Sequence, residues 1–415
     1  MDPIEVTVDI GGRELVAGTL WIHERGGQAA TFRYADSYLA SPDSYELDPV
    51  LPKAAGAFHT PSGRAMFNGF ADSAPDRWGE NLMRRAERER ARRATTAPRT
   101  LGKADFLLGV RDDARQGAVR FREPGTNAYY SMHRNAVPRL IELPRLLRAV
   151  DRLDAEGAFD SDLKDLIDAG SSLGGARPKA AVIDSSGRLA IAKFPRTDND
   201  EWNVAGWEEL ELRLARRAGL DVAQSEIVLV AGRNVLIVDR FDRHDAQRTG
   251  FASALTMLEA TDGEQRSYLE IAEVIERHSP QATTDLWELY RRIIFSILTG
   301  NTDDHLRNHA FLRKRRGWAL SPAYDLNPNP DRPARLSTAI DLDDTSASIE
   351  TALSVHGYFR LSNAAARTLV SDVERATSGW RIEATALGLP ASQVTRMADA
   401  FETDQRRIAR TLADK

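Results

Sequence analysis

The segment Gly300–Asn308 has the sequence GNTDDHLRN and lies directly after a strongly apolar stretch. The apolar residues of that stretch recur at helical spacing: Leu286, Leu289, Ile293, Ile294 and Ile297. They predict a buried helix that stops at Gly300, where a polar loop begins. A short hairpin with residues 313–317 at its tip is predicted next. It is followed by SPAYDLNPNP, residues 321–330, which holds too much proline for a helix or a central strand.

Three side chains in and after this loop have the spacing that phosphoryl transfer needs. Asp303 and Asn308 are separated by four residues, as in the kinase catalytic loop D-x-x-x-x-N. An Asp at the first position can accept a hydroxyl proton, and the Asn can reach a magnesium ion. Asp325 can serve as the second magnesium ligand. Taken alone, each motif is better explained as a polar turn, because Asn, Asp and Pro favour turns.

A strand lysine followed by a helix with several glutamates is a second feature. Lys193 lies in LAIAKFP and is similar to the lysine of the kinase motif V-A-I-K, which reaches the nucleotide phosphates. Such a lysine needs an acid to orient it, and Glu208, Glu209 and Glu211 lie on the helix predicted at residues 205–218. The alternative is an exposed strand lysine followed by a solvated helix face.

Two further segments suit a nucleotide-binding lobe. Residues 171–179, SSLGGARPK, contain a Gly-Gly pair whose N–H groups can approach phosphate oxygens, although such a pair by itself is most often a flexible turn. Residues 235–243, VLIVDRFDR, form an apolar strand in the place of a kinase hinge, with an ordinary core strand as the alternative. The order of all these parts along the chain is that of a protein kinase and is much harder to obtain by chance than any single part.

The strand and helix patterns predict an α+β protein with a protein-kinase-like bilobal fold. Residues 1–125 have hairpin patterning and are predicted to form a β-rich N-terminal subdomain. Residues 140–242 are predicted to be the small lobe with the Gly-rich loop. Residues 243–415 are predicted to be a mostly helical lobe that carries the catalytic and magnesium-binding loops.

The bulk composition excludes several classes of protein. Apolar residues make up 42% and charged residues 28% of the 415 residues, as in globular proteins of more than one domain. The net charge of −5 makes the chain a poor nucleic-acid binder by itself. The absence of cysteine excludes disulfides and thiolate metal ligands. The sequence contains neither a signal-peptide pattern nor an apolar run long enough for a bilayer, so a cytoplasmic protein without membrane contact is predicted.

The motifs together resemble the HipA family of serine/threonine-protein kinase toxins from type II toxin–antitoxin systems. That family has an S-x-x-G-x-x-x-K loop, a strand lysine followed by one residue and a proline, an E-R-F-D-R hinge, an N-x-D-x-H-x-[KR]-N loop and a P-x-Y-D motif. The matching segments are residues 172–179, 193–195, 239–243, 301–308 and 322–325. The resemblance covers roughly the last two-thirds of the chain, and FADSAPDRWGENLMRR, residues 70–85, extends it more weakly toward the N-terminus.

The resemblance implies ATP and Mg²⁺ as cofactors and a role for each motif residue. Asp303 is implied as the catalytic base, Asn308 and Asp325 as magnesium ligands, and Glu208 as the acid that orients Lys193, with Glu209 as the fallback. Autophosphorylation is implied at Ser172, or at the neighbouring Ser171. The implied ATP-binding residues are Gly174, Gly175, Ala176, Arg177, Pro178, Lys179, Lys193, Asp239, Arg240, Phe241, His305 and Tyr324.

The resemblance also implies partners. These are a protein substrate, such as an aminoacyl-tRNA synthetase or another translation factor, and a HipB-like helix-turn-helix antitoxin through which DNA is contacted indirectly. Two departures leave the particular substrate open. The loop reads G-G-A-R-P-K where better-known members have A-G-A-Q-E-K, and Asp239 replaces the hinge Glu.

Three other functions are compatible with parts of the sequence. A metal-dependent hydrolase could use Asp303, Asp304 and His305, but it leaves Lys193 and the Gly-rich loop unexplained. A lipid or small-molecule kinase is possible in principle, yet no basic amphipathic surface is evident. A non-catalytic pseudokinase scaffold is disfavoured because the motif residues are all present. The arginine-rich residues 84–93 predict either a solvated helix or a contact with nucleic acid or an acidic partner.

Overall fold

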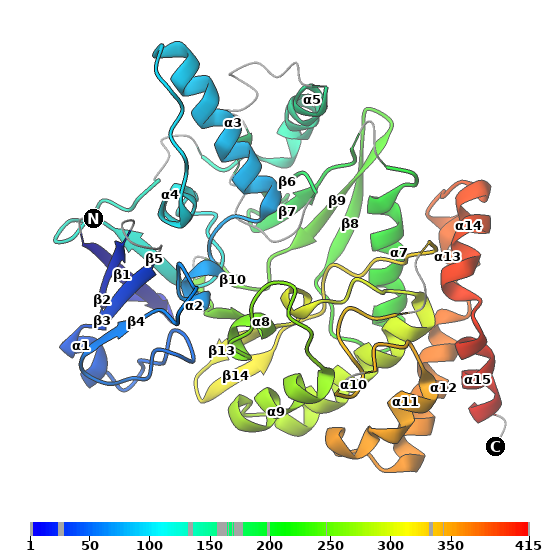
Figure 1. The fold of residues 1–415 in the computed structure, drawn as a ribbon. Coiled ribbons are helices and arrows are strands. Elements are labelled where there is room, and N and C mark those ends of the chain that lie inside the picture. The colour runs from blue at the N-terminus through cyan, green and yellow to red at the C-terminus, as the bar shows by residue number, and fades with distance from the viewer. Residues whose placement is uncertain are drawn as a thin grey trace. The chain divides into compact units, whose positions relative to one another are not determined.

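The computed structural model of the chain describes residues 3–23, 29–131, 136–155, 164, 166–167, 169, 177–196, 200–245, 247–331, 335–342 and 344–413. The chain divides into two compact units. The first consists of Met1–Asp200 and Val228–Ala252, and the second of Glu201–Ile227 and Ser253–Lys415. Strands predominate in the blue N-terminal part of the ribbon and helices in the orange and red C-terminal part (Figure 1).

A five-stranded antiparallel sheet forms the N-terminal part of the first unit. Its strand order is β4-β3-β2-β1-β5. The turn between the first two strands uses Gly11 and Gly12, whose φ angles of 62° and 79° favour glycine. The middle of the first strand is buried on both faces, since Val6, Thr7 and Val8 are all fully buried. The strands are β1 Ile4–Ile10, β2 Arg13–His23, β3 Ala29–Tyr34, β4 Ala57–His59 and β5 Val119–Arg122.

Helices of the first unit lie between the later strands of this sheet and after its last strand along the chain. They are α1 Asp36–Ala40, α2 Asn68–Ala71, α3 Arg77–Arg93, α4 Lys103–Gly109, the 3₁₀ helix η1 Leu140–Glu142 and α5 Leu143–Asp154. Helix α3 begins at the N-cap residue Asp76, whose Oδ1 accepts a hydrogen bond of 2.7 Å from the N–H of Gly79. Apolar residues of α5 recur at helical spacing and are buried in a core cluster with the second sheet: Leu143, Leu146, Leu147, Val150 and Leu153.

The second sheet of this unit has the order β6-β7-β9-β8. Its strands are β6 Lys179–Ile183, β7 Leu189–Lys193, β8 Ser225–Val230 and β9 Arg233–Asp239, of which only residues 228–230 of β8 belong to the first unit. β7 pairs antiparallel with both β6 and β9. Three short strands follow: β10 Arg243–His244, β11 Gln247–Arg248 and β12 Phe251–Ser253.

The second unit is mostly helical around one buried helix, α10 Ala282–Thr299. A hairpin of β13 Ala310–Lys314 and β14 Gly317–Leu320 follows it. Trp207, Trp380 and Phe401 form an aromatic cluster, with Trp380 stacked on Phe401 at 4.5 Å between ring centroids. The remaining elements are α7 Val204–Arg217, α8 Ala254–Met257, α9 Tyr268–His278, η2 Leu306–Asn308, α11 Ile349–Ser354, η3 His356–Phe359, α12 Asn363–Thr377, α13 Trp380–Ala386, α14 Ala391–Phe401 and α15 Asp404–Ala413.

The predicted α+β class is confirmed. The strand pairs of the N-terminal sheet, the pairs β6–β7 and β7–β9, and the hairpins β10–β11 and β13–β14 are antiparallel. The C-terminal residues form two helices, α14 and α15, because the chain leaves helical geometry at Glu402. The three-segment division stays a prediction; the two units group α7 with the C-terminal helices. Within the described residues, no helix is both long and apolar enough to span a bilayer.

Candidate functional site

The loop Gly300–Asn308 begins with a glycine that the fold requires. Gly300 caps α10 in the left-handed conformation, with φ 69°. A Cβ atom at this position would lie 2.8 Å from the Cβ and 3.0 Å from the Cα of Ala400. The next residue, Asn301, donates from Nδ2 to Ser296 Oγ at 3.2 Å and accepts from the N–H of Asn327 at 3.2 Å. The first two residues of the loop are therefore tied to the buried helix and to the proline-rich segment.

Asp304 holds the loop from the inside. Its carboxylate is buried, lies 2.9 Å from His309 Nε2 and accepts a hydrogen bond from the Tyr268 hydroxyl. Its backbone carbonyl accepts from Thr338 Oγ1 at 2.7 Å. Burial opposes its ionisation, but the charge of His309 and the hydrogen bonds from His309 and Tyr268 outweigh burial and lower the pKa of Asp304. Asp304 is therefore an ionised anchor.

Asp303 and Asn308, the first two predicted chemical residues, are brought together by this loop. The side chain of Asn308 is buried, and its Nδ2 donates to the backbone carbonyl of Asp303 at 3.0 Å. The same carbonyl accepts from the N–H of His305 at 3.0 Å. Asp303 and His305 are both exposed residues. Asp303 is thus exposed to solvent, whereas the side chain of Asn308 is buried against the backbone of the loop.

The β13–β14 hairpin brings the segment of Asp325 back to the same loop. Because the strands are antiparallel, the residues before β13 and after β14 lie at the same end, where the N–H of Ser321 donates to the carbonyl of Ala310 at 2.8 Å. The Tyr324 hydroxyl then donates to the carbonyl of Arg307 at 2.5 Å. The neighbours in sequence of Asn308 and Asp325 are therefore in direct contact.

Asp325 has a left-handed backbone, with φ 59°. Aspartate is among the few residues other than glycine that adopt this conformation, and it does so at some cost in free energy. Ala323, two residues before Asp325, is fixed from the other side, because its N–H donates to the carbonyl of Asp221 at 2.7 Å. The strained residue is thus held between two fixed segments, as side chains of functional sites often are.

The donor set of this loop fits a hard cation. With Nδ2 used in the bond to Asp303, the amide oxygen of Asn308 is the atom left for a cation, and Asp325 offers a carboxylate. Carboxylate and amide oxygens are the protein ligands that magnesium prefers. Among the described residues, no group of three or more His, Cys, Asp or Glu side chains could hold a metal. A site of this kind would depend on a substrate phosphate to complete the coordination.

Lys193 and Lys179 lie opposite each other in the second sheet of the first unit. Lys193 ends β7 and is paired in register with Lys179 on one side and Leu236 on the other. Lys179 is 2% exposed, and its Nζ lies 2.5 Å from Asp76 Oδ2 at the start of α3. The side chain of Lys179 therefore has a buried partner within its own unit, while its predicted role at ATP stays untested.

The Gly-rich loop is only partly described. The predicted residues Ser171, Ser172, Gly174, Gly175 and Ala176 lie outside the described residues. Of the rest, Arg177 forms an ion pair of 2.6 Å with Asp200, and the carbonyl of Pro178 accepts from the N–H of Phe194 at 2.9 Å.

The predicted hinge residues use their side chains within the first unit. Asp239 forms an ion pair of 2.8 Å with Arg188, and the ring of Phe241 stacks at 6.5 Å from that of Phe251. Arg240 is buried and donates to Asp242 and to the backbone of residues 114 and 115. Only backbone groups of Arg240 thus remain for a nucleotide. Sequence analysis missed Asp242, although the D-R-F-D-R pattern contains it.

The two glutamates proposed to orient a lysine have different surroundings in α7. Glu209 accepts from Arg213 Nε at 2.7 Å and from Ser225 Oγ at 2.6 Å, so it is engaged within the second unit. Glu208 is also buried. The role of Glu208 as the orienting acid, with Glu209 as the fallback, stays a prediction.

Comparisons with known proteins agree with these features. HipA of Shewanella oneidensis, named a serine/threonine-protein kinase toxin, is 29% identical over 165 residues, which cover 32% of this chain and 37% of the toxin. Y4mE of Sinorhizobium fredii, also named as a kinase, is 30% identical over 181 residues, 37% of this chain and 41% of that protein. The matched segments span only about two fifths of these relatives.

A solved structure extends the likeness to the fold. The complex of Shewanella oneidensis HipA with HipB and its operator DNA contains a chain that matches with a TM-score of 0.68 at 17% identity, over 98% of this chain and 96% of that one. This likeness shows that the α+β, kinase-like bilobal fold is that of HipA. The sequence pattern described as the HipA-like C-terminal domain matches residues 171–380, half of the chain. The chain therefore belongs to the HipA-like C-terminal domain family, whose relatives include proteins named as kinases.

Proposed function

We propose that the protein is an ATP-dependent serine/threonine protein kinase of the HipA toxin type. The observation that carries the proposal is the bond from the Tyr324 hydroxyl to the Arg307 carbonyl, 2.5 Å long. It joins the segment of Asp325 to the loop of Asp303 and Asn308, the three residues whose order and spacing are those of a kinase.

The proposed chemistry assigns one task to each residue of the loop. Asp303, on the exposed side, accepts the proton of the acceptor hydroxyl as that oxygen bonds to the γ-phosphorus. The bond between the γ-phosphorus and the β–γ bridging oxygen breaks, and ADP leaves. Asn308 and Asp325 hold magnesium, which when bound neutralises charge on the transferred phosphoryl group. Asp304 takes no part in proton transfer, since its carboxylate is bound by Tyr268 and His309. It keeps the backbone of Asp303 in place.

Each predicted nucleotide-binding residue has a proposed task. Lys193, oriented by Glu208, would contact phosphate oxygens, and residues 174–179 would cover the phosphates. Residues 239–241 would offer backbone groups to the adenine, and His305 and Tyr324 would border the site. The buried engagement of Arg240 supports a role of its backbone rather than its guanidinium group.

Autophosphorylation is proposed at Ser172, with Ser171 as the second candidate. Both precede the Gly-Gly pair in sequence. A phosphate there carries nearly two negative charges, so it would repel the phosphates of ATP across a short distance and displace the loop. Modification of this serine would then switch the kinase off.

A HipB-like helix-turn-helix antitoxin is the proposed partner, with DNA bound through it. The support is the shared fold with the HipA of the HipA–HipB–operator complex, and the chain's own net charge of −5, which suits delegation of DNA binding to a basic partner. The proposed substrate is a protein, such as an aminoacyl-tRNA synthetase or another translation factor, and the proposed location is the cytoplasm.

Phosphoproteome comparison tests the activity and finds the substrate together. Cells expressing the wild type are compared with cells expressing Asp303→Ala, and purified proteins are incubated with ATP and magnesium. We expect new phosphoserine or phosphothreonine sites, including one at residue 171 or 172, only with the wild type. Identical phosphoproteomes and no self-modification of the wild type would contradict the proposal.

The metal-dependent hydrolase is less well supported. It would need Asp303, Asp304 and His305 as ligands, but the carboxylate of Asp304 is buried against His309. A lipid or small-molecule kinase would share the same loop chemistry, and phospholipid or metabolite acceptors offered to the purified protein distinguish it. A pseudokinase scaffold would show no Asp303-dependent phosphorylation in the same assay.

A further inference from the structure

The segment that follows β9 is fastened by its own side chains. The guanidinium group of Arg240 donates to both carboxylate oxygens of Asp242, at 2.8 and 2.6 Å, and to the carbonyl of Ala114 at 2.5 Å. Arg243 donates to the Asp242 carboxylate at 2.7 Å, to the carbonyl of Gly117 at 3.2 Å and to that of Arg115. Two arginines from one segment thus bind three carbonyls of the loop 114–117.

Asp242 is at the centre of these bonds. Besides the two arginines, its Oδ2 accepts from the N–H of Gly117 at 2.8 Å. Burial opposes its ionisation, but the charges of Arg240 and Arg243 outweigh burial and lower the pKa of Asp242. Burial also lowers the pKa of Arg243 to about 9, so this arginine is still protonated at neutral pH. The interaction is therefore one between buried charges, which is lost when one partner is removed.

Gly117 permits the close approach of the two segments. It has φ 74°, and a Cβ atom there would lie 3.2 Å from the Cβ of Phe251. The ring of Phe251 also stacks against that of Phe241, which lies between Arg240 and Asp242 in the sequence. The loop 114–117 and the residues after β9 are thus packed as well as ion-paired.

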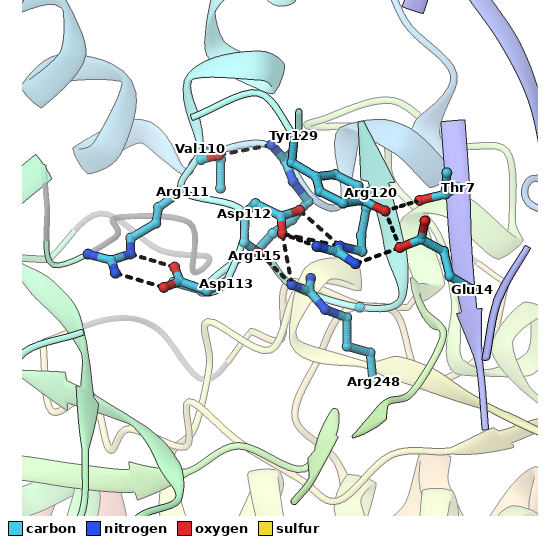
Figure 2. A network of polar contacts seen from close by, with 12 residues as sticks. Thr7, Glu14, Val110, Arg111, Asp112, Asp113, Arg115, Arg120, Tyr129 and Arg248 are labelled. Atoms are coloured by element: carbon cyan, nitrogen blue, oxygen red, sulfur yellow. Dashed lines mark hydrogen bonds and ion pairs between the residues drawn. The ribbon is translucent and has the colours of Figure 1, made fainter. Parts of the chain in front are cut away.

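A second carboxylate, Asp112, extends the fastening to the five-stranded sheet (Figure 2). Arg248 donates to the backbone carbonyl of Asp112 at 2.7 Å and to its carboxylate at 3.3 Å. Arg120 of β5 donates to the same carboxylate at 2.6 Å and to Glu14 of β2 at 2.7 Å. Figure 2 shows Asp112 between Arg120 and Arg248, with Glu14 on the far side of Arg120. Charges from β2, β5 and β11 are therefore linked through one buried aspartate.

We propose that Asp112, Arg240, Asp242, Arg243 and Arg248, here named the arginine clamp, position residues 239–241 for the base of the nucleotide. In this view Asp242 is a positioning residue and touches no substrate. The five-stranded sheet then belongs functionally to the nucleotide site, because it anchors the segment that meets the adenine. The inference rests on the proposed kinase function, in which these residues are the hinge.

The physical basis is that β-sheet pairing fixes the backbone only up to Asp239, whereas the clamp fixes the residues that follow. β9 is paired with β7 up to Asp239, where the register of the sheet ends. Beyond that point, the bonds of the clamp replace ladder hydrogen bonds, and the N–H of Thr249 returns to the carbonyl of Asp242 at 2.9 Å. Without the clamp, residues 240–245 would keep the hydrogen bonds of a two-residue strand pair, β10 with β11.

Hydrogen–deuterium exchange tests the clamp without any nucleotide. Asp242→Asn keeps the shape of the side chain and removes its charge. Arg248→Lys is a milder change, which keeps the positive charge but removes the planar guanidinium group and its several donors. We expect exchange in peptides covering 112–118 and 239–250 to rise about tenfold with Asp242→Asn and less with Arg248→Lys, with α10 unchanged. Asp151→Asn is the control, because Asp151 pairs with Arg233 at the other end of β9. Unchanged exchange in both clamp variants would overturn the proposal.

Nucleotide titration tests the consequence. The full-length proteins are titrated with ATP and with inorganic tripolyphosphate, both with magnesium. We expect Asp242→Asn and Arg248→Lys to weaken ATP binding, about tenfold for the former, and to leave tripolyphosphate binding unchanged, since only the base meets residues 239–241. Equal weakening of both probes would show general damage and contradict the clamp. A wild type that binds neither probe contradicts the kinase function instead, while the exchange data still decide whether the clamp holds its segment.

Discussion

The Nε2 atom of His309 lies 2.9 Å from a carboxylate oxygen of Asp304, the residue directly after the proposed catalytic base. Both side chains are buried, and the Tyr268 hydroxyl completes the contact. The loop of the proposed catalytic base is therefore supported by a buried carboxylate–imidazole contact on its inner side.

Replacement of Asp304 by asparagine should impair catalysis through the position of Asp303. Loss of the buried charge leaves His309 and Tyr268 poorly paired, at a cost of about 2 kcal/mol in the free energy of unfolding. A displaced loop should reduce kcat by about a hundredfold. Urea unfolding and kinase assays measure the two effects. The control is Asp262→Asn, which removes an exposed ion pair to Arg307 of the same loop and should have little effect on either. Equal kcat in both variants would contradict the positioning role.

Gly300→Ala should destabilise the protein beyond the cost of a left-handed alanine. Alanine in that conformation costs about 1 kcal/mol, and here its Cβ would also lie 2.8 Å from that of Ala400. Gly388→Ala is the matched control, since Gly388 has φ 70° with nothing within 4 Å. Thermal or urea unfolding should show a clearly larger loss for Gly300→Ala. Equal losses in the free energy of unfolding would mean that α14, which carries Ala400, moves away from the new Cβ atom at no cost.

Asp325→Ala should remove the magnesium dependence of ATP binding. The carboxylate is the charged member of the proposed ligand pair, so its loss should leave a weak affinity that no longer responds to magnesium. Calorimetry with and without magnesium measures this directly. Asp331→Ala, which breaks an exposed pair with Arg396, should behave as the wild type. Unchanged magnesium-dependent binding in Asp325→Ala would exclude this residue as a ligand.

Glu211→Gln should stabilise the protein at high pH. Burial raises the pKa of Glu211 well above its ordinary value of 4.5 and outweighs the Thr299 hydroxyl and the charge of Arg406, which act in the opposite direction. Folding then requires a bound proton, so stability falls as the pH rises above 4.5, by up to about 1.4 kcal/mol per pH unit until the raised pKa is reached. Unfolding of both proteins from pH 4 to pH 8 should show a flatter profile for the variant. Parallel profiles would show that Glu211 is ionised in the native protein.

The local elements could be predicted from the sequence because their signals are local. The apolar spacing before Gly300 predicted α10, and the hairpin predicted around residues 313–317 is β13–β14. The order of Asp303, Asn308 and Asp325 predicted the candidate site, since an antiparallel hairpin of known length joins its two halves.

The partners of charged side chains could not be predicted in this way. Lys179 is paired with Asp76, 103 residues earlier, and Arg240 with the carbonyl of Ala114, 126 residues earlier. A single sequence does not distinguish a lysine that binds phosphate from one that pairs with the N-cap aspartate of a helix.

The sequence by itself thus determined the elements, the α+β class and the order of the chemical residues, because hydrophobic period and turn chemistry act over a few neighbouring residues. Only the tertiary structure decided which charged side chains form buried contacts within the protein. Asp304, Arg240 and Asp242 are committed to buried contacts, whereas Asp303 stays exposed. The physical reason is that burying a charge is tolerated only beside a partner, and the partner is supplied by whichever distant segment packs there.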